Sequence, residues 1–179
     1  MTKNSPTSHG NFIAGIIGSN GSSKINGICP MATILDLTYN DINGNLITDD
    51  SHYDNLINCI KSFDKKVVIN ISRFLDDSLK FVIEKFKDLT NTIFVCSAGT
   101  DNELLNIDNS SLTDYPNAIS VGTASLEFLN SNISKIDKRL NIILPILSYS
   151  SFNSDGTTFS KISDSSSSWA TAVISSLIA

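Results

Sequence analysis

The chain has 179 residues, of which 41% are apolar and 17% are charged, and this composition suits one globular domain with a substantial core. Its net charge of −5 argues against a nucleic-acid partner or an anionic membrane surface, because no basic stripe is present to attract phosphates. No apolar run approaches the roughly 20 residues of a membrane span, and the N-terminal residues lack the apolar segment of a signal peptide. We therefore expect the chain, as given, to be a single cytoplasmic domain over residues 1–179.

Helix-like and strand-like apolar patterns alternate along the first half of the chain. The first helix is expected to have Ser8 as its N-cap. The expected helices lie at 9–18, 51–63 and 77–89, and the expected strands lie at 32–38, 67–72 and 92–99. Three strand–helix alternations are typical of an α/β fold in which helices cover a mostly parallel sheet.

The last third of the chain has a different pattern. Two strand-like stretches at 118–125 and 140–150 are followed by a polar, serine-rich stretch at 151–168 and by a helix at 169–179. Because the serine-rich stretch is short and leads directly into the helix, we expect a loop over the surface of the same domain rather than a linker. No internal repeat or second domain boundary is found.

The three cysteines give no sign of a metal site or a disulfide framework. Cys29, Cys59 and Cys96 are far apart, odd in number and set among apolar residues, which favours buried free thiols. No acidic loop suited to calcium is recognisable, so we expect neither a metal nor a cofactor.

Six segments, taken in order, resemble those of the subtilisin-like serine proteases (the subtilases, peptidase family S8). The segments are HGNFIAGIIG with INGICPMATI, VVINIS, TIFVCSAGTDN, DYPNAISVGTAS, NIILPILSYS and SSSSWATAVISSLI. The first resembles H-G-T-H-V-A-G-I-I followed by G-V-A-P-x-A, and the last resembles G-T-S-M-A-T-P-x-V-A-G-x-x-A-L-I. Because the order is kept over nearly the whole chain, the resemblance implies a three-layer α/β sandwich with a mostly parallel sheet flanked by helices.

The resemblance places the family's catalytic histidine at His9 and its nucleophile at Ser168. A serine hydroxyl is a weak nucleophile at neutral pH, and an imidazole within hydrogen-bonding reach can accept its proton and return it to the leaving amine. Both residues are expected at helix starts, where the dipole and the free amides favour a neutral imidazole and a developing oxyanion.

The family's catalytic aspartate has no counterpart, because its D-T/S-G motif lies on a strand upstream of the histidine. The domain is therefore expected to be incomplete and to lack that N-terminal strand. Asp36, inside the apolar stretch TILDLTY, is one candidate replacement, since a carboxylate among apolar neighbours requires a partner. Alternatively, Asp36 lies on an exposed face of the strand or caps a nearby backbone amide. Asp41 is a weaker candidate and is expected to form a turn.

Three other outcomes remain open for the missing aspartate. The chain can work slowly with a Ser–His pair alone, since losing the aspartate costs less than losing either partner. Activity can be lost altogether. The strand can also be supplied by a second chain or by an upstream segment.

Two further departures from the family concern the oxyanion hole and the substrate cleft. Where the family has an asparagine after Ala-Gly, this chain has Thr100, with Asn102 two residues later; either residue is a candidate donor or part of an ordinary turn. The family's S-L-G appears as Ser72, Arg73 and Phe74, in which Phe74 replaces a glycine that admits the substrate backbone. Ser72 and Arg73 are candidate substrate-binding residues, and Arg73 either selects an acidic side chain or is a solvated charge.

The resemblance implies a serine endopeptidase acting on peptides or proteins. The alternative is a catalytically inactive subtilisin-like domain that binds a peptide or a partner protein through the residual cleft.

Overall fold

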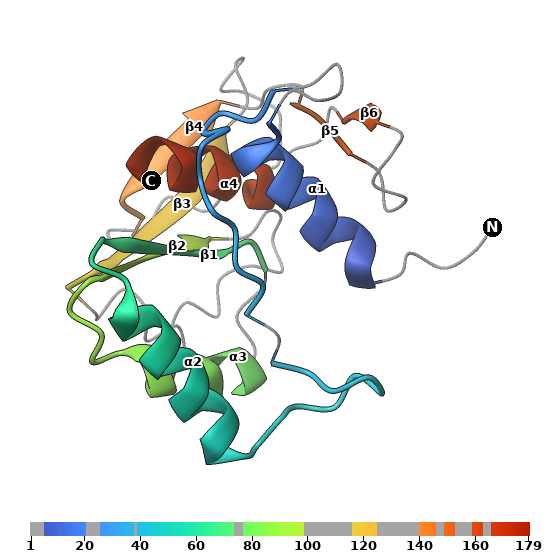
Figure 1. The fold of residues 1–179 in the computed structure, drawn as a ribbon. Coiled ribbons are helices and arrows are strands. Elements are labelled where there is room, and N and C mark those ends of the chain that lie inside the picture. The colour runs from blue at the N-terminus through green and yellow to red at the C-terminus, as the bar shows by residue number, and fades with distance from the viewer. Residues whose placement is uncertain are drawn as a thin grey trace.

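The computed structural model describes residues 6–20, 26–37, 39–73, 77–98, 116–124, 140–145, 149–152, 159–162 and 166–179. The helices are α1 (Pro6–Gly18), α2 (Asp50–Ser62), α3 (Asp77–Phe86) and α4 (Ser167–Ile178). The strands are β1 (Val67–Ile71), β2 (Thr92–Ser97), β3 (Ala118–Ala124), β4 (Ile142–Pro145), β5 (Tyr149–Phe152) and β6 (Phe159–Ile162). Figure 1 shows the sheet between two helical layers, with α2 and α3 on one side and α1 and α4 on the other.

The central sheet has the order β1-β2-β3-β4, and all of its strands are parallel. Val67 lies opposite Thr92 at its start, and Val121 lies opposite Ile142 toward the other edge. This sheet, covered by helices, confirms the α/β prediction. Within the described residues, no strand pairs with the outer edge of β1 and none precedes it in the chain.

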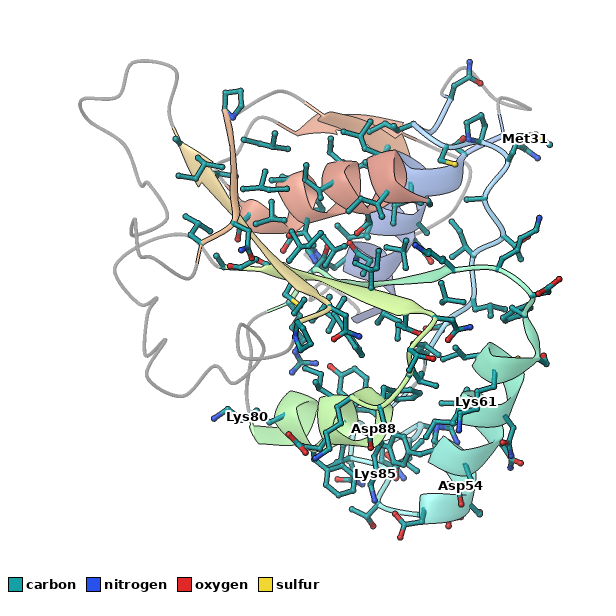
Figure 2. All side chains as sticks on the ribbon, turned by 90° about the vertical axis from the view of Figure 1, so that its left-hand side faces the viewer. Met31, Asp54, Lys61, Lys80, Lys85 and Asp88 are labelled. Atoms are coloured by element: carbon teal, nitrogen blue, oxygen red, sulfur yellow. The ribbon has the colours of Figure 1, made fainter. Side chains whose placement is uncertain are left out.

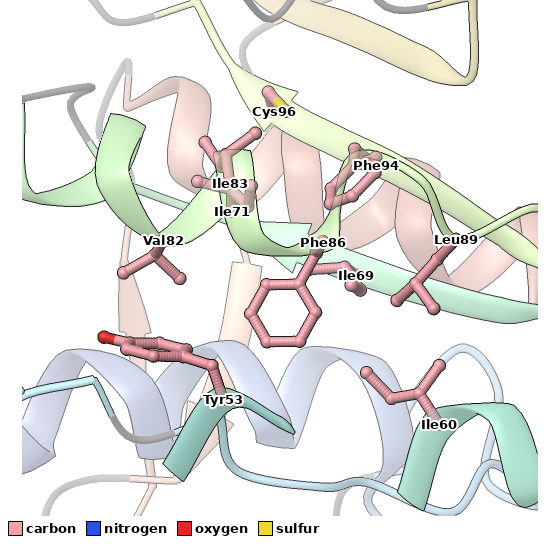
Figure 3. Close-up of a cluster of buried hydrophobic side chains, with 10 residues drawn as sticks. All are labelled: Tyr53, Ile60, Ile69, Ile71, Val82, Ile83, Phe86, Leu89, Phe94 and Cys96. Carbon is pink, nitrogen blue, oxygen red and sulfur yellow. The ribbon is translucent and has the colours of Figure 1, made fainter. Parts of the chain in front are cut away.

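The alternation of side chains along β1 and β2 separates two cores, because successive residues of a strand point to opposite faces. On one face, Phe94 and Cys96 join a large apolar cluster beneath α2 and α3, which we call the α2–α3 cluster (Figure 3). Its buried members are Tyr53, Ile60, Ile69, Ile71, Val82, Ile83, Phe86, Leu89, Phe94 and Cys96. The outer sides of α2 and α3 carry charges, including Asp54, Lys61, Lys80 and Lys85, and Asp88 lies in the turn after α3 (Figure 2).

The other face of the sheet is covered by α4, which contacts β1, β2 and β3 and packs in turn against α1. Val95 and Val121 meet Ala170 and Ile174 of α4 at this interface. Between α4 and α1 lies a second cluster, which contains Phe12, Ile13, Ile16, Trp169 and Ala172. We refer to these two clusters together as the α4 face.

Several predicted boundaries are wrong. Ser8 lies inside α1, which begins at Pro6; the fixed φ of proline suits a first helical turn. Residues 32–37 form no strand. Ile34 and Leu35 there are 46% and 48% exposed, and an extended segment becomes a strand only beside a neighbour that pairs with it.

The last third also differs from expectation. The single strand expected at 140–150 is two strands, β4 and β5, which belong to different sheets. The stretch expected to be a loop contains β6, which pairs antiparallel with β5. This hairpin is tied to α1, because the buried Ser151 hydroxyl donates to the Phe12 carbonyl oxygen at 2.6 Å.

All three cysteines are free, as expected, but only Cys96 is buried. Cys29 is half-buried and Cys59 is exposed on α2, so the prediction of burial is wrong for these two. None of the described helices combines the length and the apolar character needed to cross a membrane.

Candidate active site

Helix α4 begins at the serine run and carries Ser168 in its first turn. Ser166 is the N-cap, and its hydroxyl accepts from the backbone N–H of Ser168 at 3.3 Å. Ser167 and Ser168 are 1% and 9% exposed. The helix starts two residues before the expected Trp169, because the serine at 166 can cap it. Ser168 is thereby placed where a helix has unpaired N–H groups and a positive dipole end.

His9 and Ser168 meet at one backbone oxygen. Nε2 of His9 lies 2.9 Å from the carbonyl oxygen of Ser72, and Oγ of Ser168 donates to the same oxygen at 3.1 Å. Ser72 directly follows β1, so the meeting point lies at the carboxyl end of the sheet, where α/β proteins build their sites. Three segments that are distant in sequence therefore converge within a few ångströms.

The shared oxygen determines where the protons lie. A carbonyl oxygen only accepts, so both His9 Nε2 and Ser168 Oγ must donate to it. No hydrogen bond joins His9 directly to Ser168 among their described contacts. For Ser168 to act as a nucleophile with His9 as its base, its hydroxyl would have to turn to a His9 ring that carries its proton on Nδ1. Catalytic hydrogen bonds that form only in the substrate complex are common.

The imidazole of His9 rests against Trp169, the residue after the candidate nucleophile. The two ring centroids are 5.1 Å apart and tilted by 40°. Trp169 in turn packs on Phe12 with centroids 4.6 Å apart. One aromatic side chain thus sets the position of His9 relative to α4, although His9 itself stays exposed.

The structure does not bring Asp36 to His9. Asp36 is exposed in the segment that forms no strand, and no carboxylate in the described part of the chain contacts the imidazole. Asp41 forms a turn, as expected: its carboxylate accepts from the backbone N–H groups of Asn43 and Asn45. These hydrogen bonds, that from Asn45 above all, hold the pKa of the Asp41 carboxyl below its ordinary value.

Thr100, Asn102 and Phe74 lie outside the described residues. The strand that leads toward the first two, β2, is tied to α4, since the hydroxyls of Ser97 and Ser167 are 2.6 Å apart. Arg73 is exposed beside the shared carbonyl. Its guanidinium lies 5.6 Å from the centroid of the Tyr39 ring and donates to the Tyr39 hydroxyl.

A set of polar residues at this site was not anticipated from the sequence. Asn70 on β1 bonds both Ser72 and Ser175, although it lies in a strand with an otherwise apolar pattern. The signal was available in α4, where Ser167, Thr171 and Ser175 recur every four residues and so share one side of an apolar helix. Among the described residues, no cluster of His, Cys, Asp or Glu is arranged to hold a metal ion.

Solved structures similar to this one include a subtilisin-like serine proteinase and other proteases. A cold-adapted subtilisin-like serine proteinase superposes with a TM-score of 0.64 at 20% identity, over 95% of this chain and 59% of that protein. The S218A mutant of the protease domain of PatA gives 0.66 at 19% identity, over 95% and 62%. The prenylagaramide maturation protease PagA gives 0.60 at 19% identity, over 99% and 64%.

These likenesses confirm the expected subtilisin-like α/β fold, and the chain spans about three fifths of the length of each of these proteases. A comparison with curated protein sequences finds no significant match. The sequence profile of the Subtilase family matches residues 2–179, and the chain therefore belongs to this family.

Proposed function

We propose that this domain is a serine endopeptidase that hydrolyses peptide bonds with Ser168 as nucleophile and His9 as general base. The observation that supports this function best is the convergence of His9 Nε2 and Ser168 Oγ on the carbonyl oxygen of Ser72. A working Ser–His pair requires the Ser168 hydroxyl to turn from that oxygen to His9, with the imidazole in its Nδ1–H form.

The reaction then follows from these two groups. Ser168 Oγ attacks the peptide carbonyl carbon while its proton passes to His9 Nε2. His9 gives the proton to the leaving amine as the C–N bond breaks and an ester on Ser168 forms. Water attacks the ester and passes a proton to His9; His9 then gives that proton to Ser168 Oγ as the ester C–O bond breaks and the carboxylic acid leaves. The Ser168 N–H, once it leaves the long 3.3 Å bond to the Ser166 hydroxyl, is proposed to receive the oxyanion together with Thr100 or Asn102.

The missing aspartate is expected to slow this reaction rather than abolish it. In subtilisin, loss of the aspartate costs about 3 × 10⁴ in kcat, whereas loss of the serine or histidine costs about 2 × 10⁶. Since no described carboxylate holds His9, Trp169 is left as the group that packs against the imidazole. We therefore expect a weak peptidase from the chain as given.

We also propose that a second polypeptide can supply the family's missing strand. The Val67 N–H donates to Asn91 beside β2, so the backbone groups of alternate residues, Val68 and Asn70, point to the other edge of β1. No described strand pairs there. An added strand at this edge would end near Ser72 and His9, where an acidic side chain can orient the imidazole.

Substrate contacts are proposed for the backbone of Ser72 and for the side chain of Arg73, since the Ser72 hydroxyl is already bonded to Ser168 and Asn70. Arg73 is exposed one residue beyond the shared carbonyl, and stacking on Tyr39 preorganises its guanidinium. A planar guanidinium held in this way pairs well with a carboxylate. We propose that Arg73 favours an acidic side chain near the scissile bond.

The alternative function is peptide or partner binding without catalysis. It is favoured by the observed arrangement itself, in which one backbone oxygen occupies both His9 and Ser168. In that case the surface at the carboxyl end of β1 holds a peptide, and Ser168 is a structural residue of α4.

Labelling with a fluorophosphonate, together with cleavage of a peptide library, tests the two functions. We expect wild-type protein to label, and both Ser168→Ala and His9→Ala to abolish labelling and to lower cleavage to background. The matched control is Ser176→Ala, because the Ser176 hydroxyl bonds only the Ala172 carbonyl of its own helix; this variant should label normally. Equal labelling of wild type and Ser168→Ala contradicts the enzyme. Peptide binding that survives Ser168→Ala, with no labelling of wild type, supports the alternative.

A further inference from the structure

Two reciprocal hydrogen bonds join the end of β1 to the first turn of α4. The Ser168 hydroxyl donates to the Ser72 carbonyl oxygen at 3.1 Å, and the Ser72 hydroxyl donates to the Ser168 carbonyl oxygen at 2.9 Å. Both side chains are buried, with 9% exposure for Ser168 and 8% for Ser72. The candidate nucleophile is therefore held by its own side chain and, separately, by its backbone.

Asn70 orients the hydroxyl of Ser72. Its Nδ2 donates to Ser72 Oγ at 2.9 Å, while its Oδ1 accepts from Ser175 Oγ at 2.9 Å. Ser72 Oγ also lies 3.2 Å from Asn70 Oδ1, but its contact to the Ser168 carbonyl oxygen is shorter. A hydroxyl has one proton to give. The consistent chain of donors runs from the Asn70 amide to the Ser72 hydroxyl and on to the Ser168 carbonyl.

The same network holds α4 at two points. Ser168 and Ser175 are seven residues apart, so they lie on one side of the helix about two turns from each other. Both points are linked to β1, one through Ser72 and the other through Asn70. Two attachments to β1, with the contact between the Ser97 and Ser167 hydroxyls on β2, fix the rotation of the helix as well as its position.

We propose that Asn70, Ser72 and Ser175 are positioning residues that hold the backbone of Ser168 in place while its hydroxyl turns to His9. This inference rests on the proposed peptidase function. In the reaction, the bond from Ser168 Oγ to Ser72 must break, but the bond from Ser72 Oγ to the Ser168 carbonyl need not. The backbone therefore stays fixed when the side chain is released, and the oxygen that both catalytic groups share stays in register.

Steady-state kinetics on four variants test the proposal. We expect Ser72→Ala to lower kcat by about 10²-fold with little change in KM, the size of effect that a misplacement near 1 Å produces. Ser72→Thr, which retains the hydroxyl, should restore most of kcat. Ser175→Ala, which removes one of the two attachments, should lower kcat by a smaller factor. Ser176→Ala is the matched control, one residue further along α4, and should match wild type.

A second measurement separates the positioning role from catalysis. Trp169 is the single tryptophan of the chain and directly follows Ser168, so its emission and its quenching by acrylamide report the first turn of α4. We expect Ser72→Ala to alter both signals and Ser176→Ala to alter neither. If wild type cleaves no peptide, the proposed function fails, and the fluorescence comparison alone decides whether these residues place α4. Unchanged kcat and fluorescence in Ser72→Ala, or a Ser72→Thr variant as impaired as Ser72→Ala, overturns the proposal.

Discussion

The two faces of the central sheet are packed with different kinds of side chain. Beneath α2 and α3, the α2–α3 cluster consists of large aromatic and branched residues, among them Tyr53 and Phe94, each 1% exposed (Figure 3). On the α4 face, the most deeply buried helical positions are Ala170, Thr171 and Ala172, all 0% exposed. One strand, β2, supplies residues to both faces.

This difference suggests that one face of the sheet mainly stabilises the fold and that the other carries the candidate site. Large apolar side chains remove the most surface from water, so the α2–α3 cluster is expected to supply much of the stabilisation. Small side chains let α4 lie close to β1, within reach of hydrogen bonds between Ser72 and Ser168. The molecule thus places its polar, position-sensitive contacts on the face where bulk is least. Three predictions test this division, and they run from the largest expected effect to the smallest.

The first prediction concerns Phe94 on the α2–α3 side. Phe94→Ala should lower the free energy of unfolding by about 3–5 kcal/mol, because it removes a fully buried ring and leaves a cavity. Denaturant unfolding followed by circular dichroism measures the loss. Ile42→Ala is the control: Ile42 is fully exposed, and its loss should change stability by no more than about 0.5 kcal/mol.

The reactivity of Ser168 in the Phe94→Ala variant tests whether the two faces of the sheet are independent. Fluorophosphonate labelling per folded molecule should be unchanged in Phe94→Ala, since Phe94 faces away from Ser168. A labelling rate that falls in proportion to stability would show that the two faces are not independent.

The second prediction concerns Ala172, which packs against Phe12 and Trp169 between α4 and α1. Ala172→Leu should destabilise the fold by about 1–3 kcal/mol, because a closely packed position has no room for added methylenes. Unlike Phe94→Ala, it should also slow labelling, since Trp169 contacts His9.

Leu177 provides the control on the same helix. It is 68% exposed, and Leu177→Ala should leave both stability and labelling close to wild type. If Ala172→Leu slows labelling no more than Leu177→Ala does, the contact between Trp169 and His9 does not affect the reactivity of Ser168.

The parts of the fold that the sequence predicts well are those with strong local patterns. In α2, the apolar residues Tyr53, Leu56 and Ile60 recur at helical spacing and all face the core. The apolar runs of β1 and β2 likewise became parallel, buried strands. By contrast, ATILDLT has the composition of a strand, but its described residues, 32–37, lie outside the sheet, because pairing with a neighbour is not encoded in the segment itself.

The candidate site divides in the same way. The resemblance to the subtilases selected His9 and Ser168 as candidates, and the structure brings the two side chains together. The sequence could not predict that the two side chains meet at the Ser72 carbonyl oxygen, because every residue carries a backbone carbonyl and none is marked in the sequence. The role of Asn70 also depends on packing, because its two partners are two and 105 residues away along the chain.

The third prediction uses the thiols of the α2–α3 side and is the smallest in effect. Burial raises the pKa of Cys96 from the ordinary 9.0 to about 12, whereas Cys59 is exposed on the outer surface of α2. A thiolate-selective reagent at neutral pH should therefore modify Cys59 readily and reach Cys96 only after unfolding. Cys59→Ser should remove the fast phase.

The third prediction has a second readout, because the raised pKa of Cys96 makes the free energy of unfolding depend on pH. Below about pH 9 the thiol of Cys96 is protonated in both states, so its contribution is fully present there. Between pH 9 and about 12 the unfolded thiol loses a proton that the folded one retains, so rising pH favours unfolding. Cys96→Ala should flatten the decline in stability above pH 9 relative to wild type. Burial also raises the pKa of Tyr53, which contributes with the same sign but equally in both proteins, so their difference isolates the thiol. Identical slopes for the two proteins would show that water reaches Cys96 in the folded state. The α2–α3 cluster would then not be a dry core, and this difference from the α4 face would be lost.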